Sequence, residues 1–258
     1  MTLLPGSLDA MKKSLYLALV AIFPLSFALA QDGFPISTDR PSFSDGTSII
    51  PKGRWQVEMG YTNTQFRRSR FETVGEMLVR LPVSDRMELR LSNVGFGRSS
   101  DADGWLDPVV GFKYKLLNGS LGKPEWALIA QTTVPAGSRD FRQDETQPTV
   151  KLAGYLQLDP LTGLGGNLVA SSLSDGTDRF GQYAVSAYLT RSLNSRTGAF
   201  FEMYHVTPTA KDGPHSTGFD AGVTYLVDKA TQVDFRIGST FDPGRDGTYF
   251  GFGIGYRF

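Results

Sequence analysis

Residues Gly247–Phe258 read GTYFGFGIGYRF, and large apolar residues occupy every second position from Phe250 onward. Alternate residues of an extended strand point to opposite faces. One face then carries Phe250, Phe252, Ile254, Tyr256 and Phe258, and the other carries Gly251, Gly253, Gly255 and Arg257. The stretch therefore predicts a β-strand with one face in an apolar environment and the other in a polar one.

The same two-residue period recurs along the chain and predicts an all-β protein. Met87, Leu89 and Leu91, for example, alternate with Glu88 and Arg90. We expect about 12 strands, near residues 54–61, 76–81, 87–92, 110–116, 126–134, 150–158, 164–173, 183–190, 199–207, 219–227, 233–241 and 248–258. Each segment is about as long as a tilted strand needs to cross a bilayer, and no uncharged apolar run after residue 31 is long enough for a transmembrane helix.

The connections alternate between two kinds. Short turns at 83–86, 118–119, 159–163, 194–195 and 228–229 alternate with longer polar segments at 64–71, 96–106, 135–148, 174–180, 208–217 and 242–247. Short turns on one rim and long loops on the other are typical of outer-membrane barrels. In hydrocarbon every backbone group needs a partner within the protein, so the sheet must close. The pattern predicts a transmembrane antiparallel β-barrel. A soluble periplasmic β-sandwich or lipocalin-like barrel also alternates, but it is disfavoured because the strands of soluble sheets usually have about five or six residues.

Composition excludes several classes of protein. The 258 residues carry a formal net charge of zero, and 40% of them are hydrophobic. Basic residues are interspersed with acidic ones, so we expect no nucleic acid as a partner. The absence of cysteine excludes disulfides and thiolate metal sites.

The beginning of the chain predicts export. Met11-Lys12-Lys13 supplies a basic end, an apolar stretch follows from Leu15 to Leu29, and Ala28-Leu29-Ala30 provides a small-x-small cleavage site. We expect residues 1–30 to be a signal peptide, with Met11 as the initiator; an uncleaved membrane anchor is the alternative. Residues 31–52 would form a periplasmic or lumen-inserted segment and residues 53–258 the barrel. The predicted location is the bacterial cell outer membrane.

Two motifs carry a resemblance to a known family. The segment from Thr38 to Ser44 reads TDRPSFS, and the segment from Pro51 to Glu58 reads PKGRWQVE. They resemble the opening of the outer-membrane barrels named for the MetA pathway of phenol degradation. The resemblance implies a Gram-negative outer-membrane transporter for small solutes, with aromatic or hydrophobic compounds among the candidates. The alternation ending in Ile254, Tyr256 and Phe258 also resembles the signal that the barrel assembly machinery recognises.

Strand parity predicts which charged residues line the lumen. The candidates are Glu58, Glu72, Glu76, Arg80, Glu88, Arg90, Lys113, Lys115, Lys151, Asp220, Asp234 and Arg236. They could form a charged passage for the passive diffusion of small solutes. Alternatively, Glu76, Arg80, Glu88 and Arg90 could pair with one another and support a wall that leaves little open pore, because buried charges need partners.

Residues 31–52 are too polar to lie in lipid. We expect them to enter the lumen, with Asp39 and Arg40 paired to wall charges, and to act as a plug or gate. The other interpretation is a loose periplasmic tail, since chain termini are often poorly ordered.

Other functions remain as alternatives. A lipid-modifying outer-membrane enzyme would need a base such as His205 or His215, but no orienting third group stands at an informative spacing. A structural or surface barrel with a blocked lumen is a further possibility. We expect no catalytic, cofactor-binding or metal site and no enzyme activity. The expected partners are outer-membrane lipid and lipopolysaccharide, the barrel assembly machinery and a small-molecule solute.

Overall fold

A computed structural model describes residues 34–67, 69–93, 95–208, 211, 213–241 and 246–258. The predicted signal peptide, residues 1–30, lies outside the described residues. Within the described ranges no helix is long and apolar enough to cross a membrane.

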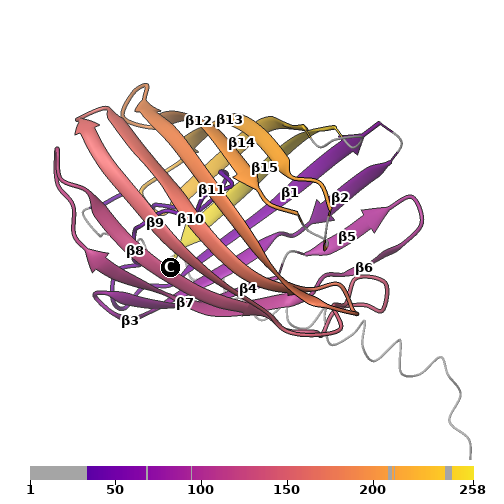
Figure 1. Cartoon of the computed structure of the whole chain (residues 1–258). Coiled ribbons are helices and arrows are strands. Elements are labelled where there is room, and N and C mark those ends of the chain that lie inside the picture. The colour runs from indigo at the N-terminus through magenta and orange to yellow at the C-terminus, as the bar shows by residue number, and fades with distance from the viewer. Residues whose placement is uncertain (1–33, 68, 94, 209–210, 212, 242–245) are drawn as a thin grey trace, which may run out of the picture.

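All the strands of the described chain belong to one antiparallel sheet (Figure 1). They are β1 (Gln56–Phe66), β2 (Arg70–Val74), β3 (Met77–Ser84), β4 (Met87–Asn93), β5 (Phe96–Ser99), β6 (Asp103–Trp105), β7 (Pro108–Leu117), β8 (Glu125–Thr133), β9 (Gln147–Asp159), β10 (Thr162–Ser174), β11 (Arg179–Ser192), β12 (Thr197–Val206), β13 (Ser216–Leu226), β14 (Thr231–Phe241) and β15 (Gly247–Arg257). Each strand pairs with its neighbours in chain order, apart from the interruptions described below.

The sheet closes on itself through β1 and β15. These strands pair in unbroken register from Gln56 opposite Arg257 to Phe66 opposite Gly247. At one end of this seam the Trp55 and Phe258 rings stack with centroids 3.9 Å apart. The predicted transmembrane barrel is therefore confirmed, because this closure gives both the first and the last strand a partner on each side, as a sheet in hydrocarbon requires.

We call each crossing of the barrel wall by the chain a strand path, and three of these paths are interrupted. β2 and β3, β4 and β5, and β6 and β7 each form one path with a break, so the wall consists of 12 strand paths. At the first break, the N–H groups of Gly75 and Glu76 both donate to the carbonyl of Gly60, at 2.8 and 3.0 Å. Gly75 has φ 73°, which favours glycine. Gly75 and Glu76 therefore both lie opposite Gly60, and such an extra residue in one strand is a β-bulge. Beyond the bulge, the positions that would have pointed inward point outward, and the reverse.

The predicted loops at 64–71 and 96–106 are largely strand. β1 extends to Phe66, β2 starts at Arg70, and β5 and β6 occupy most of 96–105. Polar residues on both faces, such as Thr62, Asn63 and Thr64, conceal the alternation there. The prediction was wrong because it required one apolar face along the full length of a strand.

The outer surface of the wall is apolar. Leu89, Leu91, Val185, Phe252 and Ile254 are between 45 and 54% exposed. The alternate positions point inward and carry the buried charged residues described below. The barrel thus has an apolar outside and a polar inside.

Candidate functional site: residues 34–52 in the lumen

Residues 34–52, here the N-terminal segment, lie inside the ring of strands (Figure 1). Hydrogen bonds join the segment to β4, β10, β12 and β14, which are distributed around the wall. The segment enters at the rim of short turns, where the Ile36 N–H donates to the carbonyl of Lys229, which lies between β13 and β14. The lumen is therefore occupied by the protein's own chain.

Asp39 is the central charge of the segment. Its carboxylate lies 2.5 Å from Arg90 and 2.8 Å from Lys113, and Arg80 is 3.9 Å away. It also accepts from the backbone N–H of Gly46 at 2.9 Å. Burial raises the pKa of the Asp39 carboxyl, but the three cations outweigh burial and hold the pKa well below its usual range. Asp39 therefore remains ionised between its cationic partners.

Asp45 extends this ion-pair network. It lies 2.7 Å from Arg90 on β4 and 2.5 Å from Lys151 on β9. The Asp45 N–H donates to the Asn167 side chain at 2.8 Å, and the Asn167 amide donates to the Asp45 carbonyl at 3.0 Å. Reciprocal bonds of this kind fix the backbone of the segment against β10.

Arg40 meets the opposite charge on another part of the wall. Its guanidinium lies 2.6 Å from Glu76 and 3.5 Å from Asp234 on β14, and it donates to the carbonyl of Phe252 at 3.2 Å. The two acidic residues of the segment thus face wall cations, while its arginine faces wall carboxylates. The charges of the segment and the wall are complementary.

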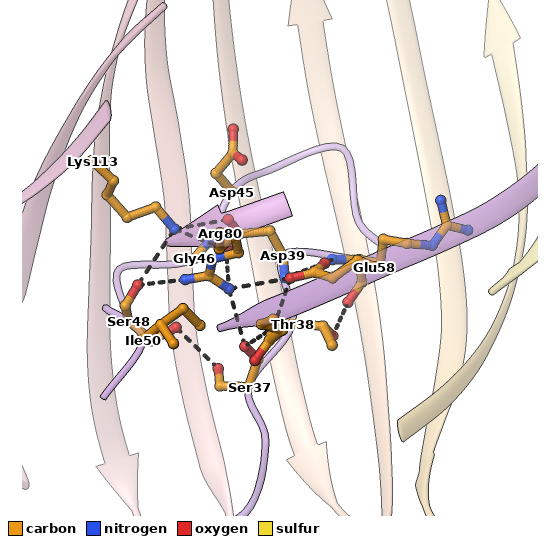
Figure 2. Close-up of polar contacts among 12 residues, drawn as sticks. Ser37, Thr38, Asp39, Asp45, Gly46, Ser48, Ile50, Glu58, Arg80 and Lys113 are labelled. Carbon is orange, nitrogen blue, oxygen red and sulfur yellow. Dashed lines mark hydrogen bonds and ion pairs between the residues drawn. The ribbon is translucent and has the colours of Figure 1, made fainter. Parts of the chain in front are cut away.

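Wall charges also bind the backbone of the segment. Arg80 donates to the carbonyls of Ser37 and Ser48, at 3.1 and 2.8 Å (Figure 2). The Ile50 N–H donates to Glu88 at 3.0 Å, and the Asp39 N–H donates to Glu58 at 2.9 Å. Arg80 in turn lies 2.8 Å from Glu88. The backbone of the segment is therefore part of the network that neutralises the wall.

The tip of the segment is held by Glu202 on β12. This carboxylate accepts from the N–H groups of Phe43 and Ser44, at 2.6 and 3.0 Å, and from the Ser44 hydroxyl. The Ser44 and Ser186 hydroxyl oxygens are 2.5 Å apart. The Phe43 ring stacks on Tyr204, with centroids 4.4 Å apart and planes inclined by 11°.

Most of the predicted lumen residues lie on the inner face. Glu58, Glu76, Arg80, Glu88, Arg90, Lys113, Lys151, Asp234 and Arg236 contact the N-terminal segment, and Lys115 and Asp220 pair with Glu125 and Arg236. The four residues that were expected to pair around the short β3–β4 turn are thus paired, partly with one another and partly with the segment. They are Glu76, Arg80, Glu88 and Arg90.

Glu72 is the exception. Tyr61 and Asn63 each donate to its carboxylate at 2.9 Å, and the Tyr61 ring contacts Phe252 on the outer face. The prediction for Glu72 assumed unbroken parity between residues 72 and 76. The bulge at Gly75 reverses that parity, so Glu76 points inward and Glu72 does not.

Several residues of the site were not predicted from the sequence. They are Asp45, Asn167, Ser186 and Glu202, together with inward-facing aromatic residues such as Tyr188 and Tyr204. Glu202 and Tyr204 alternate with Phe201 and Met203, so strand parity alone would have placed them in the lumen.

The segment leaves a cavity of about 410 Å³ beside it, toward the rim of short turns. One side is formed by residues of the segment, including Ile36 and Arg40. The other side is formed by wall residues Glu125, Tyr155, Tyr188, Thr190, Arg191, Ser192, Gly198, Ala199, Phe200, Thr224 and Gln232.

The other predicted residues have these positions. His205 and His215 stack with ring centroids 5.4 Å apart, and His205 bonds Thr217 at 2.8 Å on an exposed surface. Ile254 is exposed on the outer face, and Phe258 packs against Trp55 and Tyr256. The role of Ile254, Tyr256 and Phe258 in barrel assembly stays a prediction.

Comparison with known families identifies the chain. The model of the family described as "Putative MetA-pathway of phenol degradation" matches residues 38–258. The chain belongs to this family. The match begins at Thr38, so it includes the docked part of the N-terminal segment as well as the barrel. No curated protein matches the chain.

Solved structures with a similar fold include two outer-membrane proteins. The COG4313 outer membrane channel from Pseudomonas putida F1 has a TM-score of 0.66 at 14% identity, over 82% of this chain and 98% of that chain. The KdgM porin has a TM-score of 0.53 at 10% identity, over 77% of this chain and 98% of that chain. At these identities the likeness shows the fold. The closed barrel, its apolar outer face and the family together place the protein in the bacterial outer membrane.

Proposed function

We propose that the protein is an outer-membrane channel for small solutes and that the N-terminal segment is its plug. The charge complementarity between the segment and the wall carries this proposal. Asp39 and Asp45 bind the cations of β4, β7 and β9, whereas Arg40 binds Glu76 and Asp234. A loose terminal tail would have no need of matched charges on opposite parts of the wall.

The composition of the site suits a segment that leaves and returns. Polar and charged groups make most of its contacts, and these groups can be hydrated when the segment moves away. A permanent core would instead be built mainly from apolar side chains, whose exposure to water raises the free energy. A barrel of 12 strand paths is also wider than the filled barrels of eight strands. Displacement of the segment would therefore open a passage lined by charged side chains.

Conductance in planar bilayers tests both parts of the proposal. The mature chain and a variant that lacks residues 34–50 are compared after heat-modifiable gel migration has shown that both are folded. We expect larger and steadier current steps from the deletion variant. The substitution Asp101→Asn, at an exposed carboxylate between β5 and β6, is the control and leaves conductance unchanged.

The possible results separate the alternatives. If the folded deletion variant conducts no better than the full chain, the segment is not the plug. If neither conducts under conditions that open a control porin, the channel is refuted, and a structural barrel or a lipid-modifying enzyme becomes the better hypothesis.

A further inference from the structure

One guanidinium joins the two carboxylates that the plug brings into the lumen. Arg90 on β4 lies 2.5 Å from Asp39 through one terminal nitrogen and 2.7 Å from Asp45 through the other. Lys113 on β7 lies 2.8 Å from Asp39, and Lys151 on β9 lies 2.5 Å from Asp45. These three wall cations therefore form a single site for two neighbouring carboxylates, here the dicarboxylate site.

The wall around the dicarboxylate site carries more positive than negative charge. Among the described residues, the wall charges that contact one another or the two plug carboxylates are Arg80, Arg90, Lys113, Lys151, Glu58 and Glu88. Four cations against two carboxylates leave an excess of two positive charges, and the neighbouring pair of Lys115 and Glu125 adds no net charge. Asp39 and Asp45 balance this excess when the plug is docked. Because charges in a narrow lumen need partners, the undocked wall favours a dianion in their place.

The opposite part of the wall has the opposite sign. Glu202 and Asp220 lie directly across from each other on β12 and β13, and neither side chain is exposed. Asp234 on β14 is also buried, and Arg236, 3.9 Å from Asp220, offsets only part of this negative charge. A dianionic solute is therefore repelled by β12–β14 and attracted to β4, β7 and β9.

A solute can approach the dicarboxylate site from the cavity beside the plug. Asp39 is one of the residues that line this cavity of about 410 Å³, together with Gly46, whose N–H donates to the Asp39 carboxylate. The charged lining residues are of both signs and include Arg40, Glu125 and Arg191. Such a lining suits an ionic solute, and a solute in the cavity is next to the carboxylate that it would replace.

We propose that the dicarboxylate site binds small solutes that carry two carboxylate groups, and that such a solute competes with the two plug carboxylates for the three wall cations. A bound dianion takes the wall partners of Asp39 and Asp45, so it shifts the population toward the undocked plug. This proposal rests on the channel function and names a class of solute for it.

Calorimetric binding of succinate to the mature chain in detergent tests the proposal without measuring transport. Butyrate has the same number of carbon atoms but only one carboxylate, so it is the matched control ligand at equal ionic strength. The native chain should bind succinate weakly, because Asp39 and Asp45 occupy the site. The variant Asp39→Ala/Asp45→Ala, once heat-modifiable gel migration has shown that it is folded, should bind succinate roughly tenfold more tightly than the native chain does. In this variant butyrate should bind roughly tenfold more weakly than succinate.

Two further substitutions in the alanine variant separate the site from the overall charge of the chain. Lys151→Gln removes one cation of the site and should weaken succinate binding roughly tenfold. Lys123→Gln removes the same charge from the exposed turn between β7 and β8 and should change nothing. If the double alanine variant does not fold, Asp45→Ala alone frees Lys151 and one side of Arg90, and it should still tighten succinate binding severalfold.

The possible results decide the proposal. Equal affinities of the native chain and the alanine variant for succinate, or equal affinities of that variant for succinate and butyrate, would overturn it. Because binding is measured directly, a barrel that binds succinate but does not conduct would refute the transport function and not the dicarboxylate site.

Discussion

Asp39→Asn removes the central charge of the plug while preserving the shape of the side chain. The carboxylate is buried and pairs with Arg90 at 2.5 Å and Lys113 at 2.8 Å. Removal of one partner from a buried ion pair costs about 3–5 kcal/mol. Arg90 keeps Asp45 as a partner, and the asparagine oxygen can still accept a hydrogen bond, so we expect the lower end of this range. About 3 kcal/mol corresponds to an increase of roughly 100-fold in the undocked population of the segment.

Chemical modification of a cysteine in the plug measures this population. Ser44 is 2% exposed, and the chain has no other cysteine to react. In a Ser44→Cys background, a hydrophilic maleimide reacts only when the segment leaves the wall. When docking is fast relative to the reaction, the rate follows the undocked population. We expect Asp39→Asn to accelerate modification by about 100-fold and Asp101→Asn to have no effect. Equal rates in the two variants would refute the argument that buried ion pairs hold the segment.

Two further substitutions test separate parts of the site. Glu202→Gln weakens the hydrogen-bond acceptor for the N–H groups of Phe43 and Ser44, and hydrogen bonds to charged groups are worth about 1.5–3 kcal/mol each. The maleimide assay in the Ser44→Cys background should therefore show at least tenfold faster modification. An unchanged rate would show that Glu202 does not help to hold the plug. Gly165→Ala puts a methyl group against the Tyr188 ring and should destabilise the barrel by about 1–3 kcal/mol. Thermal unfolding followed by gel migration would record a lower Tm, whereas Gly181→Ala, where a Cβ atom comes no closer than 3.3 Å to its nearest neighbour, should leave Tm unchanged.

Strand alternation was sufficient to predict the barrel. The two-residue period marked all 12 strand paths, including those at 164–173 and 199–207, because hydrocarbon outside and water inside impose opposite demands on successive residues. Where the wall extends as β2, β5 and β6, polar and apolar residues are mixed on the two faces, as with Phe71 and Val74 among Arg70, Glu72 and Thr73, and the two-residue period vanishes. The extent of these strands therefore could not be predicted from hydrophobic pattern.

The site could be predicted only in part. Asp39 and Arg40 could be selected because charges in a segment beside a charged wall need partners, and ion pairs join both to the wall. Glu72 was misplaced because a bulge reverses parity without a clear pattern in composition, although Gly75 marks its position. The contacts of Tyr188 with Gly165 and of Tyr204 with Gly218 could not be predicted, because only the register between strands brings these residues together.

A reversible disulfide between plug and wall tests the central claim most directly. The Ser44 and Ser186 hydroxyl oxygens are 2.5 Å apart, so the double variant Ser44→Cys/Ser186→Cys can lock the tip of the segment to β11 in a chain that has no native cysteine. Thr149→Cys/Ser171→Cys is the matched control, because those hydroxyl oxygens are 2.8 Å apart and join β9 to β10 without contacting the plug. In liposome swelling, the oxidised lock should stop solute entry and reduction should restore it, while the control pair should be insensitive to oxidation. Solute entry at the same rate through the oxidised and reduced lock would contradict a plug that must move.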